Sequence, residues 1–409
     1  MIKPFRALRP APGRAAEILA PPYDVLSSAE ARDRAKGKPW SFLHVSKAEI
    51  DLDPAIDLYD RVVYAKAAEN LRHMIAAGVL VRDAKLSYYV YRLTWRGRVE
   101  TGLAAVAAVA AYNDNRIRKH EYTTPAKEDD RVRQIEAVNA QTGPVMLAYS
   151  AAPEIDALLA RAADAGAATA VDVTADEVRH QLWVIDDEAT IAALTRAVDS
   201  LPALYIADGH HRSAAAARVA QARGGQGSHD HFLAVLFPQN QMTILDYNRV
   251  LRDLNGRSPD QLVAEIRKRY AVEGSEQPVQ PKAAGEVGMY LAGRWHRLIL
   301  RQEQTAKAAQ AEDPVARLPI TLLTRNIIEP IFGITDPRTD KRIDFVGGGR
   351  GLGELARLVS SGQMAVAFAL YPTQMRDLMA VAAAGAIMPP KSTWFEPKLA
   401  DGLVSHVLD

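Results

Sequence analysis

The sequence predicts an α/β (or α+β) fold built on a mixed sheet, with a smaller α/β region toward its C-terminal end. From residue 145 onward, short apolar segments alternate with segments whose apolar residues repeat every three or four positions. Such alternation of strands and helices is typical of sheets that are at least partly parallel. The chain can also bury a substantial core, since its 409 residues are 48% hydrophobic and 24% charged.

Prolines and helical spacing define the N-terminal elements. Residues 1–28 carry five prolines, which predicts an extended segment rather than a helix. Ser27 or Ser28 then caps a short helix. A longer helix is expected over 54–77, where apolar residues recur every three or four positions and Gly78 follows.

A hairpin and a further helix come next. Residues 86–95 and 99–112 flank Arg96-Gly97 and predict two antiparallel strands. Thr124-Pro125 begins a helix that should reach about Gln141, because a cap residue followed by proline is a typical helix start.

The alternating part of the chain supplies the remaining elements of the predicted core. The expected strands cover residues 145–149, 181–185, 203–207, 231–237 and 242–250. The expected helices cover residues 153–165, 187–199, 212–223 and 258–270.

Residues 273–286 are the most linker-like stretch, because they combine two glycines with two prolines. They predict a division into a core of residues 1–272 and a C-terminal α/β region of residues 287–409. After two short strands, that region should contain a helix near 314–329, a strand at 342–346, a helix at 352–360, a strand at 364–370 and a helix at 373–384.

Composition excludes several classes of protein. The chain has no cysteine, which rules out disulfides, thiolate catalysis and cysteine-based metal sites. A net charge of +1 gives no general attraction to nucleic acid or to anionic lipid. We find neither a signal peptide nor an apolar run that could span a membrane, and therefore expect a cytoplasmic protein without sequence-specific nucleic-acid binding.

A strand-to-helix turn carries the strongest functional signal. An apolar strand ends at Asp208, and an alanine-rich helix follows after the turn. A helix N-terminus offers unpaired N–H groups and partial positive charge, Gly209 allows close ligand approach, and Arg212 adds a planar cation. The turn therefore predicts a phosphate site, with these expected binding residues: Gly209, His210, His211, Arg212 and Ser213. The alternative is that Asp208 merely caps the helix.

This turn carries a resemblance to known proteins. Asp-Gly-His-His-Arg after a strand resembles the signature of the ParB/sulfiredoxin-like superfamily, whose members bind nucleotides there and include free-serine kinases, CTP-binding partition proteins and sulfiredoxins. Nearly the whole chain also resembles the DUF1015 family of uncharacterised proteins. The segments that match this family are 4–10, 20–25, 120–121, 127–131, 139–145, 205–213 and 388–399.

The superfamily resemblance implies a nucleotide-binding core, and the departures from it select a branch. Sulfiredoxin chemistry needs a cysteine, and partition proteins carry a helix-turn-helix module and a basic surface, none of which this sequence shows. The small-molecule kinases remain. They imply Mg²⁺ with ATP, ADP or CTP as cofactor, a carboxylate base from elsewhere in the chain, and these residues at the phosphates: Asp208, His210, His211 and Arg212. Asp208 is also the expected Mg²⁺ ligand.

A second cluster of chemically capable residues surrounds the start of the predicted helix at Thr124. His120 and Glu121 precede it, and Lys127 and Arg131 share one face of it. Facing a nucleotide, the two cations could clamp phosphate, while Glu121 or Glu128 served as base or magnesium ligand. The alternative is an exposed helix with internal ion pairs.

Further residues are candidates for binding the substrate. The proline-bracketed loop 388–398 either lines a site or packs its aromatic residues on the core. The polar end of the helix near Gly143 either binds an amide or carboxylate group of the substrate or forms a simple C-cap. The expected substrate-binding residues are His120, Asn139, Gln141, Lys391, Ser392, Thr393, Tyr23 and Asp24.

Two other patterns favour ordinary structure. Residues 347–353 are rich in glycine but match neither the P-loop nor the dinucleotide pattern, so we expect a flexible connection. His229-Asp230-His231 has metal-like side chains, yet alternation at the start of a strand explains them.

These observations lead to a nucleotide-dependent phosphotransferase that acts on a small polar metabolite, with free serine suggested by the superfamily resemblance. Asp208, His210, Glu121 and Glu128 are the expected catalytic residues. Two alternatives stay open. One is a phosphomonoesterase that uses His210 or His211, and the other is a nucleotide-binding switch without turnover.

Overall fold

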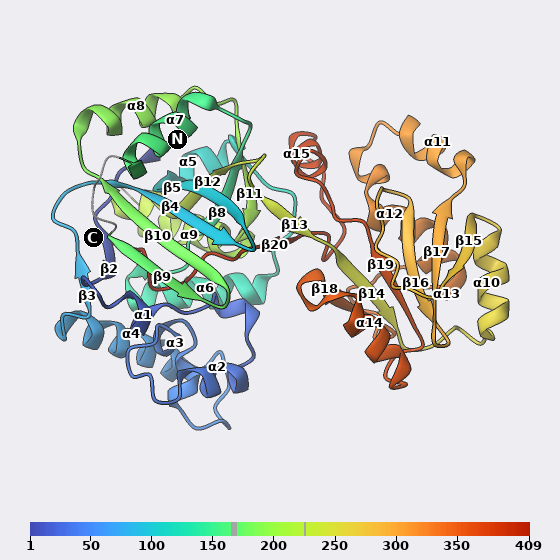
Figure 1. Ribbon diagram of the computed structural model, residues 1–409. Helices are drawn as coiled ribbons and strands as arrows, with labels where there is room; N and C mark the ends of the chain where they lie inside the picture. Colours follow the sequence, from blue (N-terminus) through green and yellow to red (C-terminus); the bar gives the residue numbers. More distant parts are fainter. Residues whose placement is uncertain (165–169, 225) are drawn as a thin grey trace. The chain divides into compact units, whose positions relative to one another are not determined.

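The computed structural model describes residues 1–164, 170–224 and 226–409, which form two compact units (Figure 1). The first unit comprises Met1–Met242 and Pro397–Asp409, and the second comprises Thr243–Glu396. The chain therefore completes the first unit only after it has passed through the second.

The stretch 273–286, expected as the linker between 1–272 and 287–409, lies inside the second unit. Its first residues belong to strand β15 (Tyr270–Ser275), which pairs with β17 (Arg294–Leu300). Glycine and proline there form the connection between two strands of one sheet rather than a link between units. The division into domains of residues 1–272 and 287–409 stays a prediction.

A mixed sheet forms the centre of the first unit, as the sequence predicts. Within the described ranges it has nine strands, with β1 (Ile2–Lys3) paired to β5 outside the main path. Along that path the order is β6 (Ile117–Arg118), β11 (Leu204–Asp208), β8 (Val145–Tyr149), β12 (His231–Pro238), β5 (Arg98–Ala108), β4 (Tyr88–Trp95), β10 (Val178–Ile185) and β9 (Val171–Ala175). The pairs β6–β11 and β8–β12 are parallel, and the other pairs are antiparallel.

The β4–β5 hairpin shows why particular residues are needed in this sheet. Arg96 and Gly97 both have positive φ, 48° and 77°, which gives a two-residue turn that matches the right-handed twist of the strands. A Cβ on Gly102 would lie 2.7 Å from the Leu236 carbonyl oxygen, so only glycine lets β5 and β12 approach this closely. The residues after Ala108 leave the strand and form α5 (Val109–Asn113).

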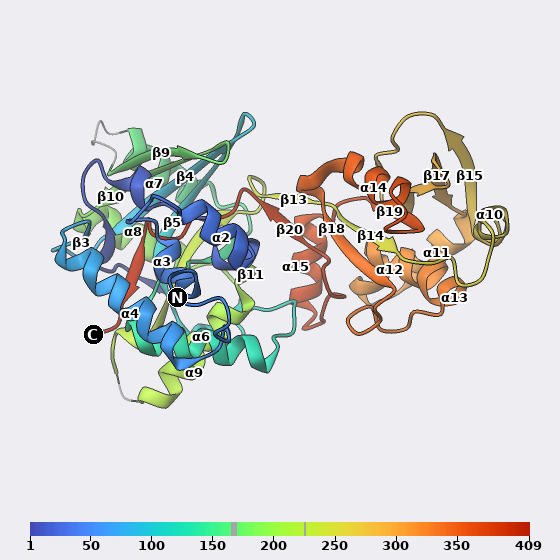
Figure 2. The same ribbon diagram turned by 90° about the horizontal axis from the view of Figure 1, so that it is seen from below.

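Helices cover this sheet. In Figure 1, α7 (Pro153–Asp164) and α8 (Glu188–Asp199) lie above the strands, and α4 (Arg61–Ala76) and α6 (Pro125–Val138) lie below them. Helix α9 (His210–Arg223) packs against α6 and contacts β8 and β12. Figure 2 shows α4, α6 and α9 in a row on the side that faces the viewer. Each helix buries one apolar side, such as Ile155, Leu158 and Leu159 of α7, because these residues recur at helical spacing.

The N-terminal segment is mostly extended. It forms β2 (Ala7–Pro10), which joins a small antiparallel sheet with β3 (Leu80–Arg82), β21 (Ser405–Val407) and β7 (Ala140–Gln141). Short helical segments follow in the order α1 (Ala15–Ile18), the 3₁₀ turn Tyr23–Val25, α2 (Ser28–Ala35), α3 (Leu43–Ser46) and the 3₁₀ turn Ala48–Asp51.

Helix ends agree with the local sequence signals at two positions and differ at a third. Ser27 caps α2 through a capping box with Glu30, and Gly78 ends α4 with a φ of 66°. Helix α4 begins at Arg61 rather than near residue 54. Aspartates before it accept hydrogen bonds from backbone N–H groups two residues later, which favours turns over helix until Asp60 provides the cap.

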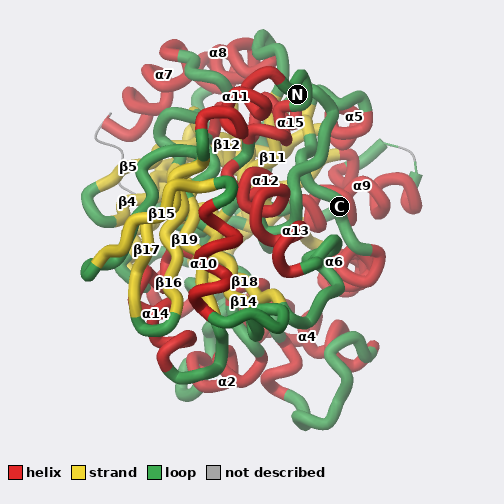
Figure 3. The backbone as a smooth tube through the Cα atoms, turned by 90° about the vertical axis from the view of Figure 1, so that its right-hand side faces the viewer, coloured by secondary structure: helices red, strands yellow, loops and turns green. Residues whose placement is uncertain are grey.

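The second unit has an antiparallel sheet of six strands within its described residues, partly visible in Figure 3. The strand order is β15, β17, β16 (Glu286–Leu291), β19 (Val366–Leu370), β14 (Tyr247–Leu251) and β18 (Ile343–Gly347). Strands β13 (Thr243–Leu245) and β20 (Trp394–Glu396) form a separate pair next to the two connections with the first unit. The helices are α10 (Pro259–Arg267), α11 (Gln302–Gln310), α12 (Pro319–Leu323), α13 (Glu329–Phe332), α14 (Gly351–Ser360) and α15 (Met375–Ala383).

Two expectations about this unit need correction. The single helix expected near 314–329 is divided into a 3₁₀ turn, α12, a π-helical turn at Thr324–Ile328 and α13, because Pro319 and Pro330 supply no backbone N–H. The glycine-rich segment 347–353 is not simply a flexible connection. A Cβ on Gly348 would lie 2.3 Å from the Asp246 carboxylate, so close packing requires glycine.

None of the helices in the described ranges combines the length and the apolar character of a membrane span.

Candidate functional site

The strand-to-helix turn lies at the C-terminal end of β11, as expected. Asp208 is the last residue of this strand, and Gly209 has a φ of 102°, which explains why glycine is needed there. Gly209 occupies the N-cap position and has no side chain that could accept a hydrogen bond from the first N–H groups of α9. The Ser213 hydroxyl, expected at the phosphate, instead donates to the His210 carbonyl at 3.0 Å and is buried.

Two cations meet on the Asp208 carboxylate. One oxygen accepts from an Arg212 nitrogen at 2.5 Å, and the other lies 3.3 Å from the Lys398 ammonium. A second Arg212 nitrogen donates to the Pro144 carbonyl. Burial alone would raise the pKa of Asp208, but the charges of Lys398 and Arg212 outweigh burial and hold this pKa well below its ordinary value. Asp208 is therefore ionised at neutral pH.

A small internal cavity adjoins this turn. Its volume is about 40 Å³, room for a few water molecules or a small polar group. Arg212 lines it together with Tyr23, Arg131, Gln141 and Asp401. The Arg131 guanidinium lies 3.9 Å from the centre of the Tyr23 ring and pairs with Asp130 at 2.6 Å.

Asp401 is the most unusual group in this cavity. Its side chain is 2% exposed, and its Oδ1 atom has no hydrogen-bond partner among the described residues. Burial raises the pKa of Asp401 to about 7, although the nearby Arg212 and Arg131 act in the opposite direction. The carboxyl group is thus poised between its neutral and ionised forms at physiological pH.

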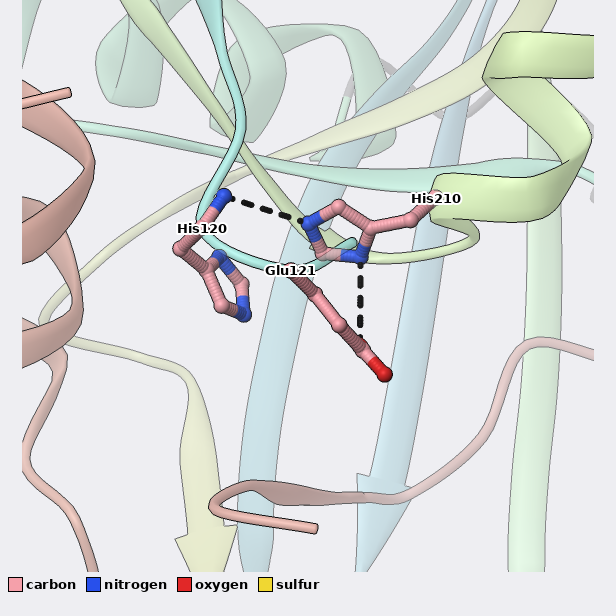
Figure 4. Close-up of side chains that lie close together, drawn as sticks. All are labelled: His120, Glu121 and His210. Atoms are coloured by element: carbon pink, nitrogen blue, oxygen red, sulfur yellow. Dashed lines mark hydrogen bonds and ion pairs between the residues drawn. The ribbon is translucent and has the colours of Figure 1, made fainter. Parts of the chain in front are cut away.

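A second group of side chains lies beside the turn (Figure 4). The His210 ring accepts a hydrogen bond at Nε2 from the His120 backbone N–H at 3.5 Å, and its Nδ1 lies 3.6 Å from a Glu121 carboxylate oxygen. Glu121 is 45% exposed, whereas both histidines are buried. The segment that carries His120 and Glu121 follows β6, which ends at Arg118 and is shorter than the strand expected there.

Two residues expected at the phosphates, His211 and Lys127, and the expected catalytic residue Glu128 lie around the start of α6. His211 accepts at Nε2 from the Thr124 backbone N–H at 3.1 Å, next to the start of α6. Glu128 is held by the Thr123 hydroxyl and by Arg218, which lies 3.3 Å away on α9. Lys127 is exposed on the same turn of α6. Glu128 is therefore part of an ion pair between two helices.

The two amide side chains expected to bind substrate support the backbone. Asn139 ends α6 with a φ of 49° and donates to the Leu408 carbonyl at 2.5 Å. The Gln141 side chain donates to the His231 carbonyl and accepts from the Leu233 N–H. Gln141 still contributes to the cavity wall, whereas Asn139 anchors the C-terminal segment.

Lys391, Ser392 and Thr393 belong to the second unit. The Ser392 hydroxyl donates to the Pro389 carbonyl at 2.6 Å, which stabilises the proline-bracketed loop. Lys391 is exposed with a φ of 56°, and Thr393 is half-buried. Their role at a site in the first unit stays a prediction.

Sequence reasoning missed two residues of the candidate site, Lys398 and Asp401. Both come from the C-terminal segment that returns to the first unit. Asp401 stands within the otherwise uncharged run Leu399–Ser405, and an isolated acidic residue in such a run is a signal of a buried functional group. Loop 388–398 was expected either to line a site or to pack on the core, but nothing local in the sequence placed Lys398 or Asp401 next to the strand-to-helix turn.

Comparisons with solved structures find only distant similarity. The chain shares 12% identity with a conserved hypothetical protein from Pyrococcus furiosus, with a TM-score of 0.34 over 74% of this chain and 95% of that one. A variant of a free serine kinase in complex with ADP has 12% identity and a TM-score of 0.34 over 71% and 87% of the two chains. SbnI from Staphylococcus aureus, with a C-terminal truncation, has 13% identity and a TM-score of 0.37 over 74% and 86%. Similarity at this level carries no argument about function.

Comparison with curated proteins gives no match. A family model described as a protein of unknown function, DUF1015, matches residues 2–321, in agreement with the predicted family. The chain therefore belongs to the DUF1015 family of proteins of unknown function.

Proposed function

We propose that the protein is a nucleotide-dependent phosphotransferase whose acceptor is a small polar metabolite, with a free amino acid such as serine as the leading candidate. The observation that carries this proposal is the convergence of Arg212 and Lys398 on Asp208 at the uncapped N-terminus of α9. Guanidinium, ammonium and helix N–H groups are the donors that hold phosphate in proteins.

The charges at Asp208 suit a ligand that brings both phosphate and a metal ion. Both oxygens of this carboxylate already contact cations, so a free Mg²⁺ ion would meet repulsion there. A nucleotide that arrives as its Mg²⁺ complex would draw Arg212 and Lys398 toward its phosphates and leave Asp208 for the metal. Mg²⁺ bound in this way would neutralise charge on the phosphates.

The lining of the cavity suits the charged groups of the acceptor. At about 40 Å³ the cavity takes only part of an amino acid, and the base and ribose of a nucleotide must lie outside it. Its wall combines the Arg131 guanidinium with the Asp401 carboxyl, whose Oδ1 atom has no hydrogen-bond partner among the described residues. A zwitterionic amino acid presents a carboxylate to the first and an ammonium group to the second.

Glu121 is the better candidate for the base that accepts the hydroxyl proton of the substrate. It is 45% exposed and lies beside His210, next to the phosphate-binding turn. Glu128 is 20% exposed and is held by Arg218 and Thr123. A carboxylate that is fixed in an ion pair is less able to accept a proton.

The test is incubation of the protein with ATP, ADP or CTP and Mg²⁺, with and without a panel of amino acids, followed by ³¹P NMR and mass spectrometry. A kinase forms a phosphometabolite only when both substrates are present. Phosphate released from a phosphometabolite without nucleotide would indicate a phosphomonoesterase. Nucleotide binding without turnover would indicate a switch. Either of these results would refute the proposal.

A matched pair of variants tests the base. Glu121→Gln should lower kcat at least about 100-fold, because general base catalysis typically contributes that much. Glu128→Gln should leave kcat within a few-fold of the parent. Loss of turnover in Glu128→Gln alone would reverse this assignment.

A further inference from the structure

Three side chains next to the phosphate-binding turn, those of His120, Glu121 and His210, form a cluster in which the burial of the His120 ring nitrogens needs an explanation. One potential ligand atom from each lies within 4.8 Å of the others. His120 is 2% exposed, and neither of its ring nitrogens makes a well-formed hydrogen bond among the described residues, although the Ile206 backbone lies close enough to raise the pKa of the ring. A buried polar atom without a hydrogen bond is unfavourable, so such an atom calls for an explanation.

Packing between the two rings explains only part of the arrangement. The imidazoles of His120 and His210 meet edge to face, with ring centres 4.4 Å apart and an angle of 87° between the planes. This contact accounts for the burial of the rings. It leaves the nitrogens of His120 without a well-formed hydrogen bond among the described residues.

The donor chemistry suits a transition metal. Burial lowers the pKa of His120 to about 4 and also lowers the pKa of His210, so both rings are neutral at pH 7. A neutral imidazole has one nitrogen lone pair, so a metal at His210 Nδ1 requires the proton of this ring on Nε2, in place of the long 3.5 Å contact with the His120 N–H. Two neutral imidazoles and a carboxylate are typical ligands of Zn²⁺, with further positions open to water. Mg²⁺ prefers an all-oxygen environment, which distinguishes this cluster from the nucleotide site at Asp208.

We propose that His120, Glu121 and His210 bind a divalent transition-metal ion of the zinc class through two imidazole nitrogens and one carboxylate oxygen. Tetrahedral zinc with bonds of about 2.0–2.1 Å places its ligand atoms roughly 3.4 Å apart. The distance between His210 Nδ1 and the Glu121 oxygen, 3.6 Å, is already close to this value. The other ligand atoms lie within 4.8 Å, so the His120 nitrogen must also come closer when the ion binds.

Metal at this cluster and proton transfer by Glu121 oppose each other. A carboxylate that binds zinc through one oxygen keeps lone pairs on the other, but the cation lowers its basicity, so it is a weaker acceptor for the proton of the substrate. Zinc should therefore inhibit the phosphotransfer proposed above, and Mg²⁺ should not. The metal site itself does not depend on that function, because it is tested by binding alone.

The experiment titrates the untagged, full-length protein, freed of metal by chelation and dialysis, with ZnCl₂ in a calorimeter. We expect one saturable site with an affinity in the micromolar range or tighter, unaffected by millimolar MgCl₂. His120→Gln and Glu121→Gln should each weaken zinc binding by more than about tenfold. His180→Gln is the matched control. His180 is also a buried, neutral histidine, but its Nδ1 atom forms a hydrogen bond with the Tyr91 hydroxyl at 2.9 Å. Its zinc affinity should equal that of the parent.

A spectroscopic measurement on the parent protein avoids any folding defect of the variants. Replacement of zinc by Co²⁺ should give visible absorption bands of a four- or five-coordinate site, and X-ray absorption should show two imidazole ligands. The chain has no cysteine, so thiolate bands cannot confuse the spectrum. Absence of saturable zinc binding, a spectrum of six-coordinate Co²⁺ with oxygen ligands, or unchanged affinity in folded His120→Gln would each overturn the proposal.

Discussion

Replacement of Asp401 by asparagine should make the protein more stable at neutral and alkaline pH. Asp401 is 2% exposed, and its pKa is raised from 3.8 to about 7, chiefly by burial. Ionisation in the native state is thus unfavourable, and asparagine keeps the shape of the side chain without the charge. The backbone hydrogen bonds between residue 401 and Ala20 are retained in Asp401→Asn.

The magnitude follows from the difference between the native and unfolded pKa values. A shift from 3.8 to about 7 corresponds to about 4 kcal/mol at 1.36 kcal/mol per unit. Below about pH 4 both states carry the proton, and Asp401 contributes nothing. Between about pH 4 and pH 7 only the unfolded state releases it, so the parent loses stability as the pH rises. Above about pH 7 the loss is complete.

The assay is urea denaturation of the parent and of Asp401→Asn at several pH values between 4 and 8, followed by tryptophan fluorescence. Subtraction of the two free energies of unfolding cancels the titration of all other groups. The difference should be near zero at pH 4 and should grow to about 4 kcal/mol in favour of the variant at pH 8. A difference that does not change with pH would refute the reasoning about Asp401.

Further predictions address the turn and its glycine. Arg212→Ala should weaken nucleotide binding by about 1.5–3 kcal/mol if charged hydrogen bonds from Arg212 reach phosphate. This corresponds to an increase of roughly 10- to 150-fold in Kd measured by calorimetry, and an unchanged Kd would contradict the role of Arg212. Gly209→Ala should lower the free energy of unfolding by about 1–3 kcal/mol, because φ is 102° and a Cβ would lie 3.1 Å from Arg212 Nε. Gly353→Ala is its control, since a Cβ there meets nothing within 4 Å and the helix should gain up to about 1 kcal/mol. Lys398→Met should raise the pKa of Asp208, measured by NMR, because one of its two cationic partners is lost.

Local signals in the sequence were sufficient for most of the core. Strand β8 at Val145–Tyr149 matches the expected range because a short apolar run follows a Gly-Pro break. The hairpin turn at Arg96-Gly97 and the cap at Ser27 depend on residues next to one another, which periodicity and turn chemistry can detect. The turn at Asp208 was found for the same reason.

Features made by distant parts of the chain were not predictable in this way. Strand β21 is three residues long and exists because Ser405–Val407 pairs with strands from the beginning and the middle of the chain. Neither Lys398 nor Asp401 has a local pattern that places it beside Arg212. His120 and His210 are 90 positions apart, and only the fold shows that their rings meet. The sequence therefore indicated His120, Glu121 and His210 as candidate residues, but it did not indicate that the three side chains lie together.

The return of Pro397–Asp409 to the first unit has a consequence for biosynthesis. A ribosome translates Asp208 and Arg212 long before it reaches Lys398 and Asp401, with the entire second unit in between. While a chain is still being made, Asp208 lacks one of its counter-ions, and the small pocket lacks one wall. The candidate site is therefore incomplete in the nascent chain, and it is completed only after translation has passed the second unit.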